Sequence, residues 1–488
     1  QARCPGSVSC AVQVPGAPCS TVPVRGAIPP ASAVGGLGQG ALMAAASPVS
    51  AADGEEAAAL AEEARKEKQL VRVIAPSVTL TVMSGAMLFS ARQAVALQQF
   101  KDASALTLFM SRLASAGALV EFLANPVFGK LADTYGRRSV MPVANFCTIW
   151  VRLLLFLQPG KRLPLILEQA VTIPMVTSFF TAYRAALGDH LRGSAFARAN
   201  ATIGMGAGAA IVTGPLLTKA VMSRADPKYC YLVSVFLAAG SMVNILANFE
   251  ESLPKEKRQP LTLSDMQPFG FLQLMRSQVL RRLMLTTGMQ TFTEGRNITD
   301  VISVYLREDL RWSWDQINNY ISAYGISLIL SGMTVKPMLK ALGMINFTTF
   351  SNVCNILSLL CTAWVPPFSL LLSASASMWL GIVFGAPGGR KRDAAESLIM
   401  KLGAEAGFGN GFLSGAMMNF RAVINVIGPL LFGGLYARGA RRGQPKLAFL
   451  AGAGTILAAE ALLRTLRPKD LGLDARGQLL QEAPPRAA

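Results

Sequence analysis

Apolar blocks of about twenty residues recur along the sequence from residue 73 to residue 466. An α-helix rises ~1.5 Å per residue, so a block of this length spans the ~30 Å hydrocarbon core of a bilayer. Twelve blocks reach that length, and the first, seventh and tenth have the least distinct ends. They cover residues 73–96, 104–128, 139–158, 164–187, 198–221, 229–249, 279–304, 316–338, 344–363, 367–386, 411–437 and 446–466. We therefore expect an all-α membrane protein with twelve transmembrane helices.

The composition excludes most other classes of protein. Apolar residues make up 52% of the chain and charged residues 15%, against about 25% charged in a typical soluble domain. The net charge of +18 could indicate a nucleic-acid partner, but the basic residues lie between apolar blocks and not in one patch. One histidine and seven scattered cysteines without a C-x-x-C pair give no metal site. We expect no enzymatic activity, no cofactor and no nucleic-acid partner.

The apolar blocks fall into two sets of six, separated by a hydrophilic stretch. Residues 1–60 are a low-complexity run that indicates a disordered leader, with a transit peptide or an upstream extension of the gene as alternatives. The other parts are a charged cytoplasmic segment (61–72), an N-terminal six-helix bundle (73–249), a cytoplasmic linker (250–278), a C-terminal six-helix bundle (279–466) and a cytoplasmic tail (467–488).

The distribution of lysine and arginine sets the expected orientation. If the first helix runs outward, the cytoplasmic segments, which include 255–282 and 390–401, carry about twice as many basic residues as the opposite loops. Because basic residues stay on the cytoplasmic side, both termini are expected there. A basic cluster within 438–446 goes against the rule. The sequence leaves open whether the membrane is the plasma membrane or that of an organelle.

One short motif occurs twice at equivalent places. Gly214-Pro215-Leu216-Leu217 recurs as Gly428-Pro429-Leu430-Leu431, and each copy lies in the fifth helix of its set. Two six-helix halves related by internal repetition are typical of secondary transporters, whose substrate site lies near mid-membrane between the halves. We therefore expect the two bundles to be pseudo-symmetric.

The loop between the second and third blocks carries the most specific motif. It reads Gly129-Lys130-Leu131-Ala132-Asp133-Thr134-Tyr135-Gly136-Arg137-Arg138. Its glycines permit tight turns, and Asp133 and Arg137 are spaced to pair across one helical turn. This loop resembles the signature loop of the major facilitator superfamily. The likeness covers roughly residues 73–466 and is closest to the tetracycline-resistance type of drug/proton antiporter.

The resemblance implies a conformational latch and an interface that closes during transport. The latch, which in that family holds the outward-open state, would consist of Gly129, Asp133, Gly136, Arg137, Arg138 and Asp189. The interface helices would carry Gly204, Gly208, Gly214, Pro215, Gly428 and Pro429. A solvated loop that only fixes topology is the alternative for the first set, and ordinary close helix packing is the alternative for the second. The antiporters carry an arginine early in the fourth helix, where this sequence has Glu168.

Polar and charged side chains inside the expected helices are candidates for the substrate or proton pathway. A charge at mid-bilayer costs at least ~2.5–3.5 kcal/mol and needs a partner or a wet cavity. The candidates are Glu121, Glu294, Asn297, Arg421 and Asn425. Glu294 and Asn297 share a helix face and are expected to line the cavity, or the outer rim if their helix begins later. Arg296 and Asp300 are spaced to pair with each other.

Some of these charges have structural interpretations. Glu121 is a pathway candidate, or a glutamate paired with a donor on a neighbouring helix. Arg421 could attract an anionic substrate or neutralise Glu294. Arg152 and Glu168 lie near the outer ends of consecutive helices and are expected to form a salt bridge.

The sequence thus predicts a monomeric secondary active transporter that moves a small organic solute through the lipid bilayer by alternating access. Proton-coupled export is the form that the resemblance implies, and no G-x-x-x-x-G-K-[S/T] motif is present. The alternatives are an uncoupled facilitator or symporter for a metabolite, and a non-transporting membrane sensor or scaffold with the same fold. The substrate is not set by the sequence.

Overall fold

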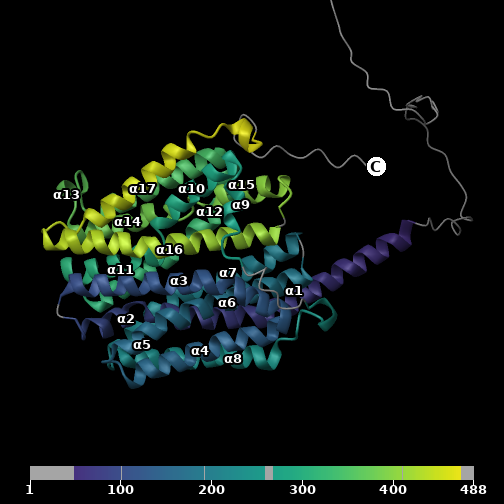
Figure 1. Ribbon diagram of the computed structural model, residues 1–488, viewed down its shortest axis with the longest axis horizontal. Coiled ribbons are helices and arrows are strands. Elements are labelled where there is room, and N and C mark those ends of the chain that lie inside the picture. The colour runs from purple at the N-terminus through teal and green to yellow at the C-terminus, as the bar shows by residue number, and fades with distance from the viewer. Residues whose placement is uncertain (1–48, 101, 192, 259–266, 409, 474–488) are drawn as a thin grey trace, which may run out of the picture. The chain divides into compact units, whose positions relative to one another are not determined.

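A computed structural model describes residues 49–100, 102–191, 193–258, 267–408 and 410–473, and all the regular elements in this part of the chain are helices (Figure 1). Contacts between residues divide the chain into two units, Gln1–Glu56 and Ala57–Ala488. All that follows concerns the second unit. Most of the expected leader lies outside the described residues, but α1 (Val49–Ala86) begins inside it.

The first group of helices follows the six expected N-terminal spans. Asp102 precedes α3 (Ala103–Tyr135) and caps its N-terminus: the Asp102 carboxylate accepts from the backbone N–H groups of Ser104 and Ala105 at 3.1 Å each. The elements after α1 are α2 (Leu88–Leu97), α3 (Ala103–Tyr135), α4 (Arg137–Leu157), α5 (Arg162–Leu167), η1 (Glu168–Thr172), α6 (Ile173–His190), α7 (Gly193–Met222) and α8 (Lys228–Asn248).

The second group begins after the hydrophilic stretch, which itself contains η2 (Lys255–Lys257) and α9 (Phe271–Leu274). It consists of α10 (Gln278–Phe292), α11 (Arg296–Val304), η4 (Tyr305–Asp309), α12 (Trp314–Thr362), α13 (Phe368–Leu371), α14 (Ala374–Gly388), α15 (Asp393–Glu405), α16 (Asn410–Arg441), α17 (Leu447–Leu463) and η5 (Pro468–Leu471). In Figure 1 α3 and α16, one from each group, run side by side along their length.

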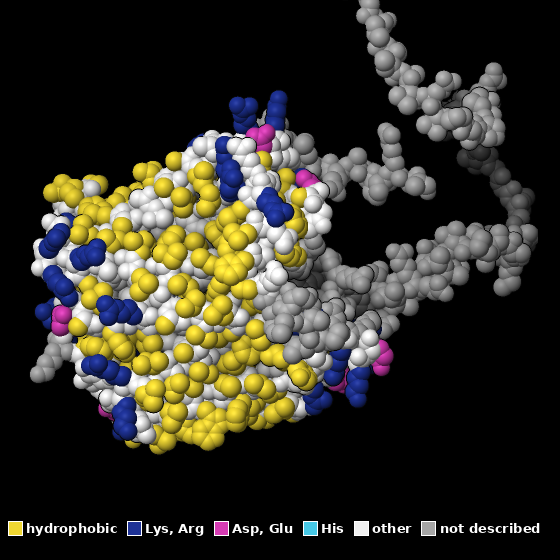
Figure 2. Space-filling model, in the orientation of Figure 1, with side chains coloured by type: hydrophobic (Ala, Val, Ile, Leu, Met, Phe, Trp, Pro, Cys, Tyr) yellow, Lys and Arg dark blue, Asp and Glu magenta, His cyan; other side chains and the backbone are white. Residues whose placement is uncertain are grey.

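Eight helical runs among the described residues are long and apolar enough to cross a membrane. They are Arg65–Leu97, Ser104–Tyr135, Arg137–Leu157, Arg162–His190, Thr202–Met222, Lys228–Asn248, Trp314–Thr362 and Phe412–Arg441, and the apolar Leu447–Leu463 is shorter. Figure 2 shows hydrophobic side chains spread over the visible face, with Lys and Arg gathered towards two opposite ends. Large apolar residues such as Trp150 and Phe236 point outward, 54% and 67% exposed, as a lipid-facing surface requires.

Several helices of the second group differ from a single straight span. At 49 residues α12 would be ~74 Å long, more than twice the hydrocarbon core. It is divided at Gly343, whose φ of 74° is not helical, so that two shorter helices follow each other. The expected seventh span is divided between α10 and α11, and after the expected tenth span turns at residues 389–392 separate α14 from α15.

Residues 390–401, which we expected in a cytoplasmic segment, lie in the turn after α14 and in α15. Lys391 is 1% exposed, and α15 packs Leu398 and Ile399 into a hydrophobic core. Consecutive basic residues resemble a polar loop in sequence, but here they meet a carboxylate on another helix.

The buried apolar residues form three cores that are distributed unequally along the helices. One core joins both groups, since it combines Met87, Leu106 and their neighbours with Tyr305, Phe432 and theirs. The other two lie towards the opposite helix ends. One is built around Phe179 in the first group, and the other around Leu283 and Ile399 in the second, with Phe122 of α3 added. The two groups thus share a large core at one end, and at the other end the first group contributes Phe122 to the core of the second.

Candidate functional site

Two helix breaks lie against each other inside the second group. The chain leaves helical geometry between α10 and α11, where Gly295 has φ 53° and ψ −140°, and turns at residues 389–392 interrupt the helix between α14 and α15. Irregular backbone at membrane depth is stable only where protein buries it or where it lines a wet cavity. Glu294 lies in the first break, and Lys391 and Arg392 lie in the second.

Side chains from both breaks form a central ion cluster, defined as Glu294, Lys391, Arg392, Glu396 and Arg421. One oxygen of Glu294 lies 2.6 Å from Lys391 Nζ and the other 2.7 Å from Arg392 Nη2. Arg392 also lies 3.3 Å from Glu396, which in turn contacts Arg421 of α16. Each carboxylate is shared by two cations.

The members of this cluster differ in their exposure. The side chain of Lys391 is 1% exposed, whereas those of Glu294 and Arg392 are each 21% exposed and that of Arg421 is 34% exposed. Burying a lysine without its carboxylate would be costly, so Glu294 holds Lys391 in place. Arg421 is thus the most exposed member of the cluster, and Lys391 is the most enclosed.

A further ion pair connects the two groups of helices. Arg296 of α11 contacts the Glu121 carboxylate of α3, and Glu121 also accepts from Thr177 Oγ1 of α6 at 3.0 Å. The expected Arg296–Asp300 pair does not form; instead Asp300 accepts from Gln93 of α2 at 3.0 Å. The Arg296–Glu121 and Asp300–Gln93 contacts each join a helix of the first group to a helix of the second.

Asn297 is placed as a structural support and not in an open cavity. It is 1% exposed, and its amide donates to the carbonyl of Thr291 at 2.9 Å, across the break that contains Glu294. A Cβ on Gly428 would overlap the Asn297 side chain, so this glycine lets α16 approach the break. Asn425 lies one turn before Gly428 and is half-buried.

A second buried charged group, the outer ion cluster, consists of Arg92, Arg152 and Glu168. Glu168 lies 3.2 Å from Arg92 of α2, not in the expected direct bridge to Arg152. Arg152 instead donates to Ser84 Oγ at 2.8 Å. Glu168 begins the π-helical turn η1, a geometry often found at functional sites.

The signature loop brings charges from three helices together. Arg137 lies 2.5 Å from Asp133 at the end of α3 and 3.4 Å from Asp189 at the end of α6. Two residues that the sequence did not indicate complete this latch cluster. Ser252 donates to Asp189 at 2.8 Å, and Glu251 accepts from the backbone N–H of Arg137 at 2.9 Å.

Gly136 is required where it stands. Its φ of 97° lies in a region that favours glycine, and a Cβ there would overlap the Glu251 carboxylate. Arg138, two residues later, donates its backbone N–H to Glu251 at 3.2 Å and its guanidinium to the Leu246 carbonyl at 2.9 Å. By contrast, a Cβ on Gly129 would meet no atom within 4 Å.

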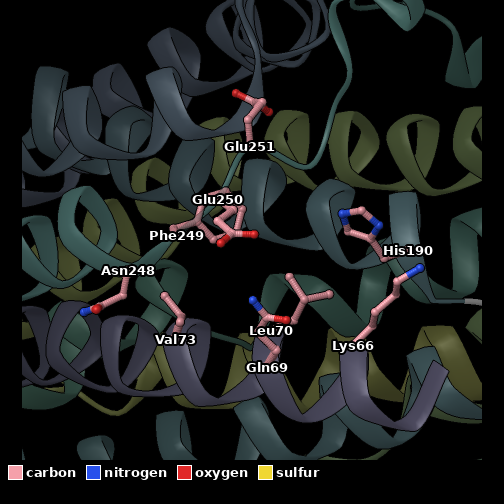
Figure 3. Close-up of a pocket in the computed structure, with 9 residues that line it drawn as sticks. All are labelled: Lys66, Gln69, Leu70, Val73, His190, Asn248, Phe249, Glu250 and Glu251. Atoms are coloured by element: carbon pink, nitrogen blue, oxygen red, sulfur yellow. The ribbon is translucent and has the colours of Figure 1, made fainter. Parts of the chain in front are cut away.

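A small cavity of about 170 Å³ adjoins the latch cluster (Figure 3). Lys66 and Gln69 of α1 line one side, and His190, Glu250 and Glu251 line others. His190 is the only histidine of the chain and directly follows Asp189 of the latch cluster.

The glycines of the expected interface helices differ in how closely neighbouring atoms approach them. A Cβ on Gly214 would overlap Ala86 and Met87, where α1 passes into α2, and a Cβ on Gly208 would press on Ile329 of α12. Gly204 has open space around it. Pro215 and Pro429 lie inside α7 and α16 directly after the two matched glycines. Gly214 and Gly428 therefore each seat against a break in the first helix of their own group.

The pair α3 and α16 is tight at one end and separated at the other. A Cβ on Gly433 would overlap Ser111, and Ser115 donates to the Val426 carbonyl at 2.5 Å. Towards the signature loop, a Cβ on Gly129 or Gly415 would meet nothing within 4 Å, and both residues line a cavity of about 250 Å³. The helices thus diverge towards the latch cluster.

Sequence reasoning missed Lys391, Arg392 and Glu396. The signal was present in the run Arg390-Lys391-Arg392 with a glutamate one turn later, directly after an apolar helix. A polar loop and a charged helix break have the same kind of sequence, and only the partner Glu294, between α10 and α11, distinguishes them.

Comparison with known proteins gives a family for this architecture. The sequence profile described as Major Facilitator Superfamily matches residues 74–390. The Hippocampus abundant transcript 1 proteins of Mus musculus and Homo sapiens are each 22% identical over 328 residues, which is 65% of this chain and 64% of theirs. The rat Hippocampus abundant transcript-like protein 1 is 23% identical over 325 residues, 65% of this chain and 61% of its own length. The aligned part thus spans less than two thirds of these relatives.

Solved structures share the fold at low sequence identity. The human organic anion transporter MFSD10 (TETRAN) superposes with a TM-score of 0.60 at 17% identity, over 81% of this chain and 99% of that one. The nucleoside transporter NupG gives 0.58 at 12% identity, over 81% and 98%. A POT family transporter in complex with a thioalcohol-conjugated peptide gives 0.64 at 14% identity, over 82% and 96%.

Proposed function

Because the chain belongs to the major facilitator superfamily, we propose that it is a secondary active transporter that moves a small organic solute by alternating access. Members of this family are transporters and not enzymes, and the chain is a multi-pass integral membrane protein. The similar structures are named as transporters of organic anions, nucleosides and peptides. Their solutes differ, so their names support transport of a small solute and do not select one.

The architecture that we propose has twelve membrane-spanning helices in two pseudo-symmetric six-helix bundles, 73–249 and 279–466. It acts as a monomer with both termini in the cytoplasm. Two observations support the repeat. Gly214 and Gly428 occupy equivalent places, each against a break in the first helix of its own bundle. The divided helices account for the expected spans that are not straight helices of full length.

The observation that carries the proposal is the central ion cluster with the Arg296–Glu121 pair beside it. Lys391 is buried, and four carboxylate–cation contacts join different helices. Charges are costly inside a membrane, so a scaffold would gain nothing from them. Charges of this kind within a membrane mark substrate and ion pathways. The pair Arg296–Glu121 also links the two bundles, so a change of charge at either residue would alter how they pack together.

We propose that the transport is coupled to protons, with Glu294 as the first candidate for the proton site. Export in exchange for protons is the direction that the resemblance to the drug/proton antiporters favours. Co-transport of solute and proton is the second candidate, and one observation favours it. Glu294 uses both oxygens to neutralise two cations, so its protonation would free those cations for a solute.

The latch cluster has a separate role in this proposal. Arg137 with Asp133 and Asp189 would hold the cytoplasmic ends of the N-terminal bundle in one conformation, and the interface glycines would let the bundles approach in the other. The ion pairs at Arg137 and the clash that any Cβ on Gly136 would cause support this role.

The test is solute-driven proton movement in proteoliposomes that contain the full chain. A pH-sensitive dye inside the vesicles is followed while organic anions, cations and neutral solutes are added in turn. We expect a pH change with one class of solute, and its loss in Glu294→Gln. Glu405→Gln is the matched control, since Glu405 is an exposed residue paired only within its own helix, with Lys401. Folded protein that moves no solute would contradict the transporter proposal.

A further inference from the structure

A short segment between the two groups of helices lies at the end where α3 and α16 diverge. It comprises residues 267–271, which we call the aromatic strap, and its last residue begins α9, which packs beside α16 (Figure 1). Gln267 and Gly270 of the strap line the cavity of about 250 Å³ that Gly129 of α3 and Gly415 of α16 also line. The strap therefore borders the space between the two groups of helices.

The second group of helices holds the strap in place. Asn419 of α16 donates its amide to the carbonyl of Pro268 at 3.2 Å. Phe271 is 6% exposed, and its ring centroid lies 5.5 Å from that of Phe420. Phe420 in turn lies so close to α10 that a Cβ on Gly288 would overlap its ring. A hydrogen bond and a buried ring thus attach the strap to the second group.

The contact of the strap with the first group depends on one ring. The centroid of Phe269 lies 5.4 Å from that of Phe122 of α3, and the two rings meet edge to face at 71°. Within the described part of the chain, this is the one ring contact that the strap makes with the first group. Phe122 is 5% exposed, whereas Phe269 is 56% exposed. The contact can therefore break while the strap stays attached to the second group.

Four rings form a row from α3 to α16. Their centroids are separated by 5.4 Å (Phe122 to Phe269), 6.4 Å (Phe269 to Phe271) and 5.5 Å (Phe271 to Phe420). Aromatic pairs attract each other at separations of this size. Since Phe122 is fixed to α3 and Phe420 to α16, the complete row forms only when the two helices lie at about their present separation.

The two helices have room to approach each other at this end. A Cβ on Gly129 or on Gly415 would meet no atom within 4 Å, so closing the cavity between them causes no clash there. The strap lines the same cavity, and an approach of α3 to α16 would displace it from α3. Gly415 is exposed with the strap in place, so the strap does not seal the cavity. Its position is that of a spacer and not of a lid.

We propose that the aromatic strap stabilises the conformation in which α3 and α16 are separated near the latch cluster, and that this end closes only when Phe269 leaves Phe122. This inference rests on the alternating access proposed above and adds the element that sets the balance between its two conformations. The segment between the bundles is then part of the moving machinery. Loss of one aromatic pair shifts such a two-state equilibrium about two- to tenfold.

A distance between spin labels on the two helices tests this role. Full-length protein without native cysteines is reconstituted in lipid nanodiscs and labelled at Tyr135→Cys and Ser414→Cys. Both residues are exposed and neither lines the cavity, so the labels leave it free to close. We expect Phe269→Ala to raise the ratio of short to long distances about two- to tenfold. The measurement needs no solute.

Three further variants serve as controls. Phe269→Tyr keeps the ring and should retain the distances of the unchanged strap. Phe236→Ala removes a phenylalanine of α8 that is 67% exposed, and it should have no effect. Phe122→Leu should cause the same shift as Phe269→Ala, and the two together should shift the ratio no further, because both remove one contact. Retained circular dichroism and elution volume identify variants that are folded.

The outcomes separate this inference from the proposed function. Unchanged distances in folded Phe269→Ala would overturn the role of the strap. A shift to longer distances would also overturn it, because the strap would then draw the helices together. Absence of flux for every solute in proteoliposomes would contradict the transport function, but it would not alter the result of the distance measurement.

Discussion

At the scale of single residues, glycines decide how closely charged groups can approach. Asp133, Arg137 and Asp189 come together because the motif holds the first two one helical turn apart and Asp189 ends α6 beside them. That arrangement is readable from the sequence, although its role as a latch stays a prediction. Glu251 could not be predicted, because it lies 114 residues from Arg137 and belongs to no motif.

Replacing Gly136 by alanine is expected to destabilise the latch cluster. A residue other than glycine at its φ of 97° costs ~1–3 kcal/mol, and the new Cβ would also displace the Glu251 carboxylate. Gly129→Ala is the matched control within the same motif, because a Cβ there meets no atom. The measurement is thermal unfolding in detergent. A Gly136→Ala protein as stable as Gly129→Ala would show that the loop relaxes freely.

At the scale of helices, the elements follow from hydrophobic block length except where they break. The apolar blocks up to Asn248 correspond to helical runs long enough to span a membrane. The breaks at Glu294 and Lys391 could not be predicted, since each depends on a charge partner from a helix about a hundred residues away. Helix length is a local property of the sequence, and ion pairing between helices is not.

The contact of α3 with α16 provides a prediction at this scale. Gly433→Ala would place a methyl group on Ser111 and push the two helices apart, whereas at Gly434 the added Cβ meets nothing within 4 Å. We expect Gly433→Ala to lose ~1–3 kcal/mol of stability, as is usual for overpacking, and to reduce solute flux. Gly434→Ala should retain both. Equal behaviour of the two variants would mean that this helix contact is not tight.

At the scale of the second unit, the two groups of helices share a large core at the end away from the latch cluster, whereas near it the first group contributes only Phe122 to the core of the second. The gap between Gly129 and Gly415 follows from this arrangement. Hydropathy predicts where helices cross the membrane. At both ends of the interface between the two groups, however, the side chains are similarly apolar. The sequence therefore could not indicate which end of the bundle interface is closed.

Thiol labelling tests this asymmetry. In a background without native cysteines, Gly415→Cys should react quickly with a water-soluble maleimide, since residue 415 is exposed and lines the cavity. Ser111→Cys, a nearly isosteric change at a site that is 2% exposed, should react slowly. Binding of a transported solute that closes the cavity would slow the reaction at residue 415. Equal rates at both positions would contradict a closed contact between α3 and α16 at Ser111.

His190 has a further consequence because the chain contains no other histidine. Its imidazole lines the cavity beside the latch cluster, next to Asp189 and near Glu250 and Glu251 (Figure 3). A protein with one imidazole gives one set of ring resonances in a magnetic resonance spectrum, so the signal needs no assignment. The fold has thus placed a built-in spectroscopic reporter at the latch, and its chemical shift would follow the making and breaking of those ion pairs without any added label.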